Sequence, residues 1–144
     1  MLFACFVVLA SVVYIFYILR KNLFKDLVYI CKYLKNNISF NKNNINTLLT
    51  NCFKDISKQS RYLIENNSKQ VSILVAGRNN KNLLSDFFKS IGKGDVDYEL
   101  NNLTYYETNF DNNLKISTEE LKTKGQMYFK LIIGLGLIVC ILLI

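Results

Sequence analysis

The stretch MLFACFVVLASVVYIFYIL at residues 1–19 carries no charged side chain, and the same holds for LIIGLGLIVCILLI at residues 131–144. A helix of about 19 residues rises about 28 Å, close to the thickness of the hydrocarbon core of a bilayer. The second stretch reaches a similar length if its helix begins at Met127 and Lys130 extends its ammonium group to the membrane surface. The two ends therefore predict transmembrane helices over residues 1–19 and 127–144.

The region between these ends, residues 20–126, carries almost all the charge of the chain, which sums to +7. Basic residues flank both apolar segments on the side of this region: Arg20, Lys21, Lys25, Lys115, Lys122 and Lys124. Because such residues concentrate in cytoplasmic loops of membrane proteins, we expect a cytoplasmic domain with both termini outside. A cleaved signal peptide is the alternative for residues 1–19. It is less favoured because the positive charges follow the apolar run instead of preceding it.

The middle region shows helical spacing and no sustained alternation typical of strands. An apolar stripe continues from the first apolar segment to about residue 35. The clearest amphipathic pattern is formed by Ile45, Leu48, Leu49, Cys52, Phe53 and Ile56. Apolar residues at i, i+3, i+4 and i+7 lie on one face of a helix. Shorter helices are predicted over residues 59–65, 69–76 and 83–91, so the fold class is all-α, a small helical bundle between two transmembrane helices.

A corner is predicted between the helix at residues 83–91 and a long final helix. Gly92 can end the first helix in a left-handed conformation, which glycine adopts at little cost. Asp95 is placed to cap the second, with Asp97 and Glu99 near its positive dipole end. From there only Gly125 interrupts the helical pattern before the membrane, and one glycine costs about 1 kcal/mol. We therefore expect one continuous helix, bent at Gly125, that enters the bilayer.

The sequence offers no set of residues for catalysis, for a cofactor or for a metal. Histidine is absent, which removes the most common general base and metal ligand. The four cysteines include no C-x-x-C pair, and we expect them to be reduced thiols in helices. The tripeptide at residues 92–94, Gly-Lys-Gly, lacks the spacing of a phosphate-binding loop. Solvated faces and i,i+4 pairs explain the carboxylates near the last helix. Scattered tyrosines and lysines do not predict nucleic-acid binding.

Two stretches near the C-terminus resemble a known family. LLSDFFKSIGKGD at residues 83–95 resembles the "L-L-x-L-x-K-x-L-G-x-S-D" stretch of stage III sporulation protein AB, with Gly94 in place of the usual serine. KGQMY at residues 124–128 is similar to the family's "K-x-x-K-M-Y" stretch before its closing membrane helix. The resemblance points to a component of the channel apparatus between mother cell and forespore. The residues that we single out as structural or interaction candidates are Leu84, Gly92, Gly94, Asp95, Tyr98, Met127, Tyr128 and Gly136.

The resemblance implies a bundle similar to the F-type platform domains of type II secretion. It also implies a partner ATPase, other channel subunits and a place in the outer forespore membrane, facing the mother cell; self-association stays open. On this reading the protein is a non-enzymatic platform. The alternative is a small holin-like protein that permeabilises the membrane through its two ends. The amphipathic helix at residues 45–56 favours the platform, because a simple holin does not need a folded core.

Overall fold

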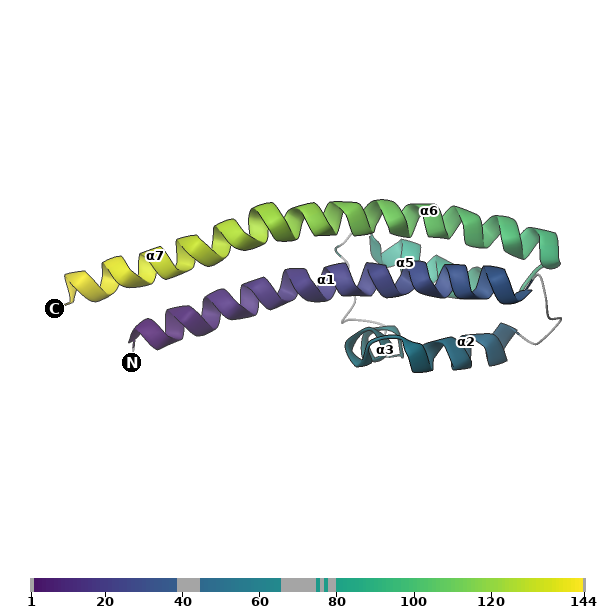
Figure 1. Cartoon of the computed structure of the whole chain (residues 1–144), viewed down its shortest axis with the longest axis horizontal. Coiled ribbons are helices and arrows are strands. Elements are labelled where there is room, and N and C mark those ends of the chain that lie inside the picture. The colour runs from purple at the N-terminus through teal and green to yellow at the C-terminus, as the bar shows by residue number, and fades with distance from the viewer. Residues whose placement is uncertain (1, 39–44, 66–74, 76, 78–79, 144) are drawn as a thin grey trace.

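A computed structural model describes residues 2–38, 45–65, 75, 77 and 80–143, and every regular element among them is a helix (Figure 1). Two long helices run the length of the molecule, and three short ones lie beside them. Their bounds are α1 Leu2–Ile38, α2 Ile45–Asp55, α3 Lys58–Glu65, α5 Asn80–Ser90, α6 Val96–Glu120, η1 Leu121–Gly125 and α7 Gln126–Leu142. The predicted all-α class is confirmed.

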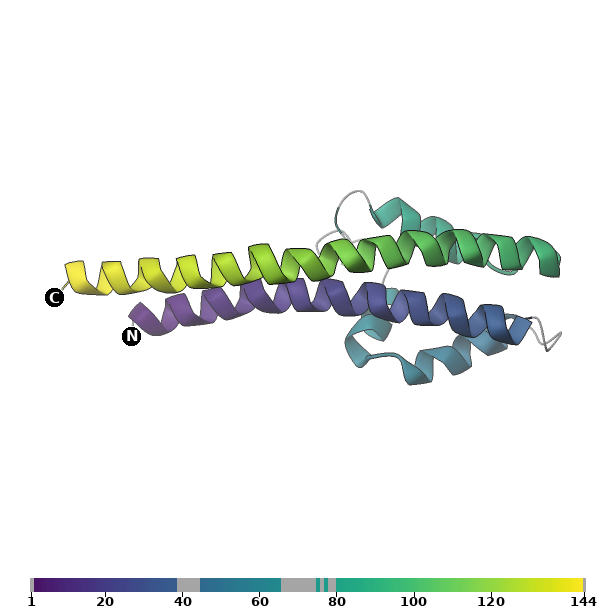
Figure 2. The same ribbon diagram turned by 45° about the horizontal axis from the view of Figure 1, so that its top comes forward.

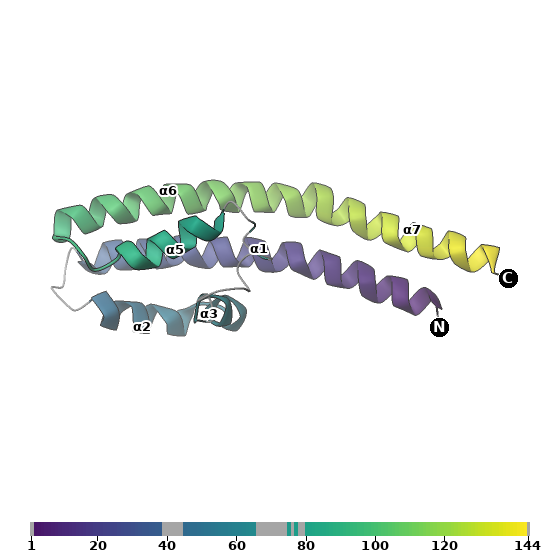
Figure 3. The ribbon, with the colours of Figure 1, turned by 180° about the vertical axis from the view of Figure 1, so that it is seen from behind.

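The two long helices form an antiparallel pair with both chain termini at the same end (Figure 1). One is α1; the other is α6, η1 and α7, which together form one continuous helix over Val96–Leu142. The three short helices flank the half away from the termini, with α5 on one side of the pair and α2 and α3 on the other (Figure 2; Figure 3). The chain is therefore a long helical hairpin with a bundle at one end.

The hydrophobic core lies in this bundle half and is centred on Phe87 of α5. The Phe87 ring lies 5.1 Å from the rings of both Tyr106 and Phe110 of α6, measured between centroids, and meets both edge-on. Buried side chains from the other helices complete the core; they include Leu27 and Leu34 of α1 and Cys52 of α2. The predicted stripes of residues 45–56 and 83–91 thus face a common interior.

The half of the hairpin near the termini has no such core. Helices Phe3–Ile38 and Val96–Leu142 are each long and apolar enough to cross a membrane, by length and composition. Their most apolar windows are only 6% and 11% buried inside the structure. The central helices of a soluble protein would bury most of these side chains, so this half of the molecule is suited to an apolar surrounding. The boundaries at residues 19 and 127 stay predictions, since α1 and the final helix pass them without a break.

Most short helices match their predicted bounds. The pattern at residues 45–56 corresponds to α2 and residues 59–65 to α3. The helix predicted at residues 83–91 corresponds to α5, which begins three residues earlier, at Asn80. The first helix ends at Ile38, three residues beyond the predicted end at about residue 35. The helix predicted at residues 69–76 lies outside the described residues, apart from Val75, which is helical and buried.

The final helix does continue past Gly125, as predicted, but through a conformation that the sequence did not indicate. Residues Leu121–Gly125 form one π-helical turn, η1, between α6 and α7. The helix curves gently along its length (Figure 1). A π turn holds one residue more than an α turn and is often found at functional positions.

Candidate functional site

The corner between α5 and α6 begins with a left-handed residue. Helix α5 ends at Ser90, and Gly92 follows with φ of +83°. A side chain at this φ is strained, which explains why glycine ends the helix as predicted. The nearest atom to a Cβ added at Gly92 would be Ile45 Cδ1 at 4.0 Å, so the backbone conformation and not space requires the glycine.

Asp95 caps α6 as the sequence indicated. Its backbone is extended, and its Oδ1 accepts a hydrogen bond from the backbone N–H of Tyr98 at 2.9 Å. This bond satisfies one of the N–H groups that the first turn of a helix leaves without a partner.

Glu99 holds the corner together from inside. Its side chain is buried, with 1% of its surface exposed. Its Oε1 accepts hydrogen bonds from the backbone N–H groups of Gly92, Lys93 and Gly94 at 2.9, 2.9 and 3.1 Å. Successive N–H groups that converge in this way form a concave anion-binding nest, and the carboxylate fills it. We expected Glu99 only to offset the helix dipole, so its role in the corner was missed.

Tyr98 and Gly94 are coupled by close contact. A Cβ added at Gly94 would overlap the aromatic ring of Tyr98, and it would lie 2.9 Å from Tyr98 Cβ. Tyr98 itself is largely exposed on the outside of the corner. The absence of a side chain at Gly94 therefore makes room for this tyrosine.

The remaining candidates do not join the corner. Leu84 is a buried core residue of α5. Met127 and Tyr128 are exposed on the first turn of α7. Gly136 lies further along α7, where a Cβ would meet Phe6 Cβ of α1 at 2.8 Å. The predicted residues thus mark four places: the corner, the bundle core, the exposed first turn of α7 and the contact between the two long helices.

Two ion pairs between α1 and α6 were also missed. Arg20 Nη1 lies 2.8 Å from Glu120 Oε2, and Lys35 Nζ lies 3.1 Å from Glu107 Oε2. The helical spacing of these carboxylates predicts solvated faces and i,i+4 pairs. That explanation is incomplete: Glu120 also pairs with Lys124 at i,i+4, but both glutamates reach across to the other long helix.

The thiols of the bundle are buried and unsuited to react. Cys31 of α1 and Cys52 of α2 have no exposed surface. Burial raises the pKa of both thiols, that of Cys52 to about 12, because the charged thiolate loses its hydration. Among the described residues no group of three Cys, Asp or Glu side chains is placed to hold a metal ion.

These features define a class: all-α proteins in which two candidate membrane helices pair as a hairpin and carry a helical bundle at one end. The family model for stage III sporulation protein AB matches residues 64–144, more than half of the chain. The chain therefore belongs to the stage III sporulation protein AB family, and the predicted resemblance is confirmed. The match includes the corner, α6, η1 and α7, whereas α1 and α2 lie before it. No curated protein and no solved structure matches the chain.

Proposed function

We propose that the chain is a non-enzymatic platform of the sporulation channel, which couples a cytoplasmic ATPase to the membrane part of the apparatus. The observation that carries this proposal is the continuous helix from Val96 to Leu142. It begins at the bundle corner and ends in the apolar half of the molecule, so it joins the part that can meet an ATPase to the part suited to the bilayer.

The bundle end of this helix is held firmly. Leu103 and Phe110 anchor α6 in the core, and Glu107 and Glu120 tie it to α1 through ion pairs. A well-packed helix moves as a rigid body, so a displacement at the corner reaches η1 at the end of α6 instead of being absorbed within the bundle. The π turn η1 is where the helix can adjust, because its hydrogen bonding differs from that of its neighbours.

The proposed orientation places the bundle in the cytoplasm and both termini on the far side of the membrane. The basic residues that follow residue 19 and precede residue 127 support it. The common end of the two termini supports it as well, since an antiparallel pair of spanning helices requires that arrangement (Figure 1). Family membership supports the outer forespore membrane. The buried core of the bundle favours a platform over the holin-like alternative.

The test interrupts the final helix in the full-length chain in a sporulating host. Ile116 is an exposed residue of α6, and Ile116→Pro removes a helix hydrogen bond there. We expect spore formation to fall to the level of the gene deletion while the variant still reaches the membrane. Ile116→Ala, the matched control, should sporulate normally. Normal spores from the deletion strain would overturn the proposal.

The second test concerns the ATPase partner. The tagged full-length chain should co-purify with the partner ATPase that the family resemblance implies, and a chain with residues 20–126 replaced by an unrelated helical linker should not. Failure of the intact chain to retain the ATPase, in membranes where both proteins accumulate, would remove the coupling role.

A further inference from the structure

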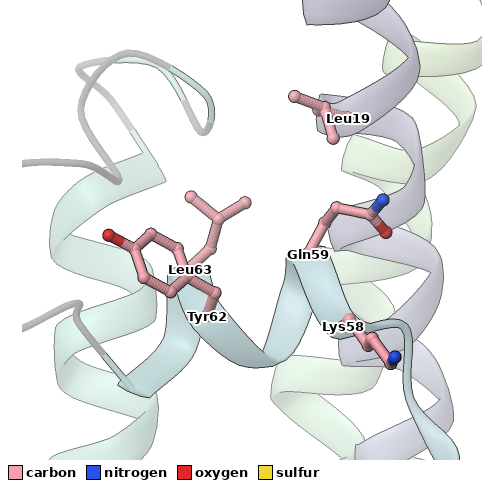
Figure 4. Close-up of a pocket in the computed structure, with 5 residues that line it drawn as sticks. All are labelled: Leu19, Lys58, Gln59, Tyr62 and Leu63. Atoms are coloured by element: carbon pink, nitrogen blue, oxygen red, sulfur yellow. The ribbon is translucent and has the colours of Figure 1, made fainter.

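An apolar hollow lies between α1 and α3, outside the features described so far. It has a volume of about 330 Å³ and is lined by Leu19 of α1 and by Lys58, Gln59, Tyr62 and Leu63 of α3. Figure 4 shows that Leu19 projects from α1 into the open space, and that Tyr62 and Leu63 of α3 lie on the opposite side of this space. The hollow is open to the surroundings, so a ligand can enter it from outside.

The position of the hollow relates it to the membrane surface. Leu19 is the last residue of the uncharged N-terminal stretch, and Arg20 follows it directly. Helix α3 lies at the end of the bundle nearest the termini and crosses the direction of α1, so that it appears almost end-on (Figure 1). If the two long helices span a bilayer, α3 lies along its cytoplasmic surface.

The side chains of α3 suit that place. Tyr62 has 61% of its surface exposed, although it is aromatic, while its neighbours Leu63 and Ile64 pack against the core. Exposed tyrosines are favoured at the level of lipid headgroups. Lys58 is exposed and forms no ion pair among the described residues. Tyr62 and Lys58 are therefore the side chains of α3 that can meet the membrane surface.

We propose that the hollow binds an anionic phospholipid of the cytoplasmic leaflet. The upper part of an acyl chain fills the space between Leu19 and Leu63, and the Lys58 ammonium pairs with the phosphate. Tyr62 covers the lipid from the outside. The proposal rests on the membrane insertion that the proposed function also requires, and it adds a lipid contact that fixes how deep the bundle sits.

The absence of tryptophan from the chain allows a direct test. Three single-tryptophan variants of the full-length protein are reconstituted in vesicles whose phosphatidylglycerol is brominated on the upper acyl chain. Tyr62→Trp reports whether a brominated acyl chain lies in the hollow. Tyr105→Trp is the matched control, because Tyr105 is 60% exposed but lies on α6 in the bundle half. Phe16→Trp lies within the predicted span and reports insertion.

We expect strong quenching of Phe16→Trp, at least twofold quenching of Tyr62→Trp and little quenching of Tyr105→Trp. Quenching of Tyr62→Trp should weaken when phosphatidylcholine with the same bromination replaces the phosphatidylglycerol, and also when Lys58→Gln is added.

Quenching of Phe16→Trp alone, with Tyr62→Trp no different from Tyr105→Trp, would overturn the lipid site and leave membrane insertion intact. Quenching of Tyr62→Trp that ignores both the lipid charge and Lys58→Gln would overturn the anionic ligand. If Phe16→Trp is not quenched, insertion fails, and the lipid site and the proposed function fail with it.

Discussion

One side-chain oxygen of the buried Glu99 accepts three hydrogen bonds. Removing Glu99 should therefore lower the free energy of unfolding by more than removing the helix cap does. Glu99→Ala leaves the N–H groups at residues 92–94 without their acceptor. Hydrogen bonds to charged groups are the stronger ones, so we expect a loss of about 2–3 kcal/mol. Asp95→Ala should cost about 1 kcal/mol through the lost cap. Urea unfolding of the full chain in detergent, followed by circular dichroism, measures both.

Asp97→Ala is the control for this series. Asp97 is an acidic residue of the same helical turn and is exposed. Its removal should change the free energy of unfolding by no more than about 0.5 kcal/mol. Equal losses from Asp97→Ala and Glu99→Ala would mean that dipole compensation, and not the nest, explains the acidic residues.

Gly94 and Tyr98 form a second pair whose coupling can be measured. Gly94→Ser adds a Cβ where the Tyr98 ring lies, so one of the two must move, at a cost of about 1–2 kcal/mol. Tyr98→Ala alone should be nearly neutral because the ring is exposed. It should restore part of the stability of Gly94→Ser, because it removes the overlap with the ring but keeps the Tyr98 Cβ at 2.9 Å. A double-mutant cycle from unfolding curves gives the coupling energy. Additive effects would contradict the contact.

For single residues, the sequence predicts roles that depend on the immediate neighbours along the chain. It does not predict contacts that depend on how the backbone folds between them. Gly92 and Asp95 could be assigned because the left-handed helix end and the cap each depend on a few neighbouring residues. Glu99 could not be assigned in the same way. Its carboxylate meets the nest only because the corner folds the backbone at residues 92–94 over the first turn of α6. A buried glutamate four residues after a cap carries no local sign of that.

Gly134 and Gly136 of α7 can be used to test the contact between α1 and α7. Gly136 lies against Phe6, whereas nothing lies within 4 Å of a Cβ added at Gly134. Gly136→Ala should therefore push the helices apart at a cost of about 1–2 kcal/mol. Gly134→Ala should be neutral or slightly stabilising, since alanine favours the helix. Thermal unfolding of the full chain in the same detergent compares the two. Equal effects would contradict the close approach at Gly136.

The π turn can be removed without rotating the residues beyond it about the helix axis. Deletion of Thr123 takes one residue from η1 and restores α spacing, so that Glu120 and Gly136 keep their faces. We expect stability within about 1 kcal/mol of the native chain, with fewer spores if the turn is needed for coupling. Deletion of Asn112 in α6 is the control, because it rotates everything beyond it by about 100°. Similar losses of stability from both deletions would contradict the role of η1 as an inserted turn.

Helix positions follow from the apolar stripes, but the partners of the helices do not. The stripes predicted α2, α3 and α5 because each needs one buried face. The ion pairs of Arg20 with Glu120 and of Lys35 with Glu107 depend on the register between α1 and α6. That register is set where the buried side chains of α1 and α6 pack together in the core. A single helical pattern contains no information on it.

At the scale of the whole molecule, the core thiols report whether the bundle is closed. Cys31 and Cys52 come from different helices and are both fully buried. Because burial raises the pKa of Cys52 to about 12, the folded chain keeps a proton that the unfolded chain releases from about pH 9 upward. The contribution of this thiol to stability is therefore complete below about pH 9 and is lost as the pH rises toward about 12.

The same burial makes thiol labelling a measure of global opening. In a full-length chain with Cys5→Ser and Cys140→Ser, reconstituted in vesicles, only the two core thiols remain. At pH 9 a thiol with a pKa of about 12 is about one part in a thousand thiolate. A water-soluble maleimide should thus react at least about 100-fold more slowly than in denaturant. The added substitution Glu99→Ala should speed the reaction in proportion to its loss of stability, because labelling then follows the opened population. Fast labelling of the native bundle, unchanged by Glu99→Ala, would mean that α1 and α2 do not enclose a common core.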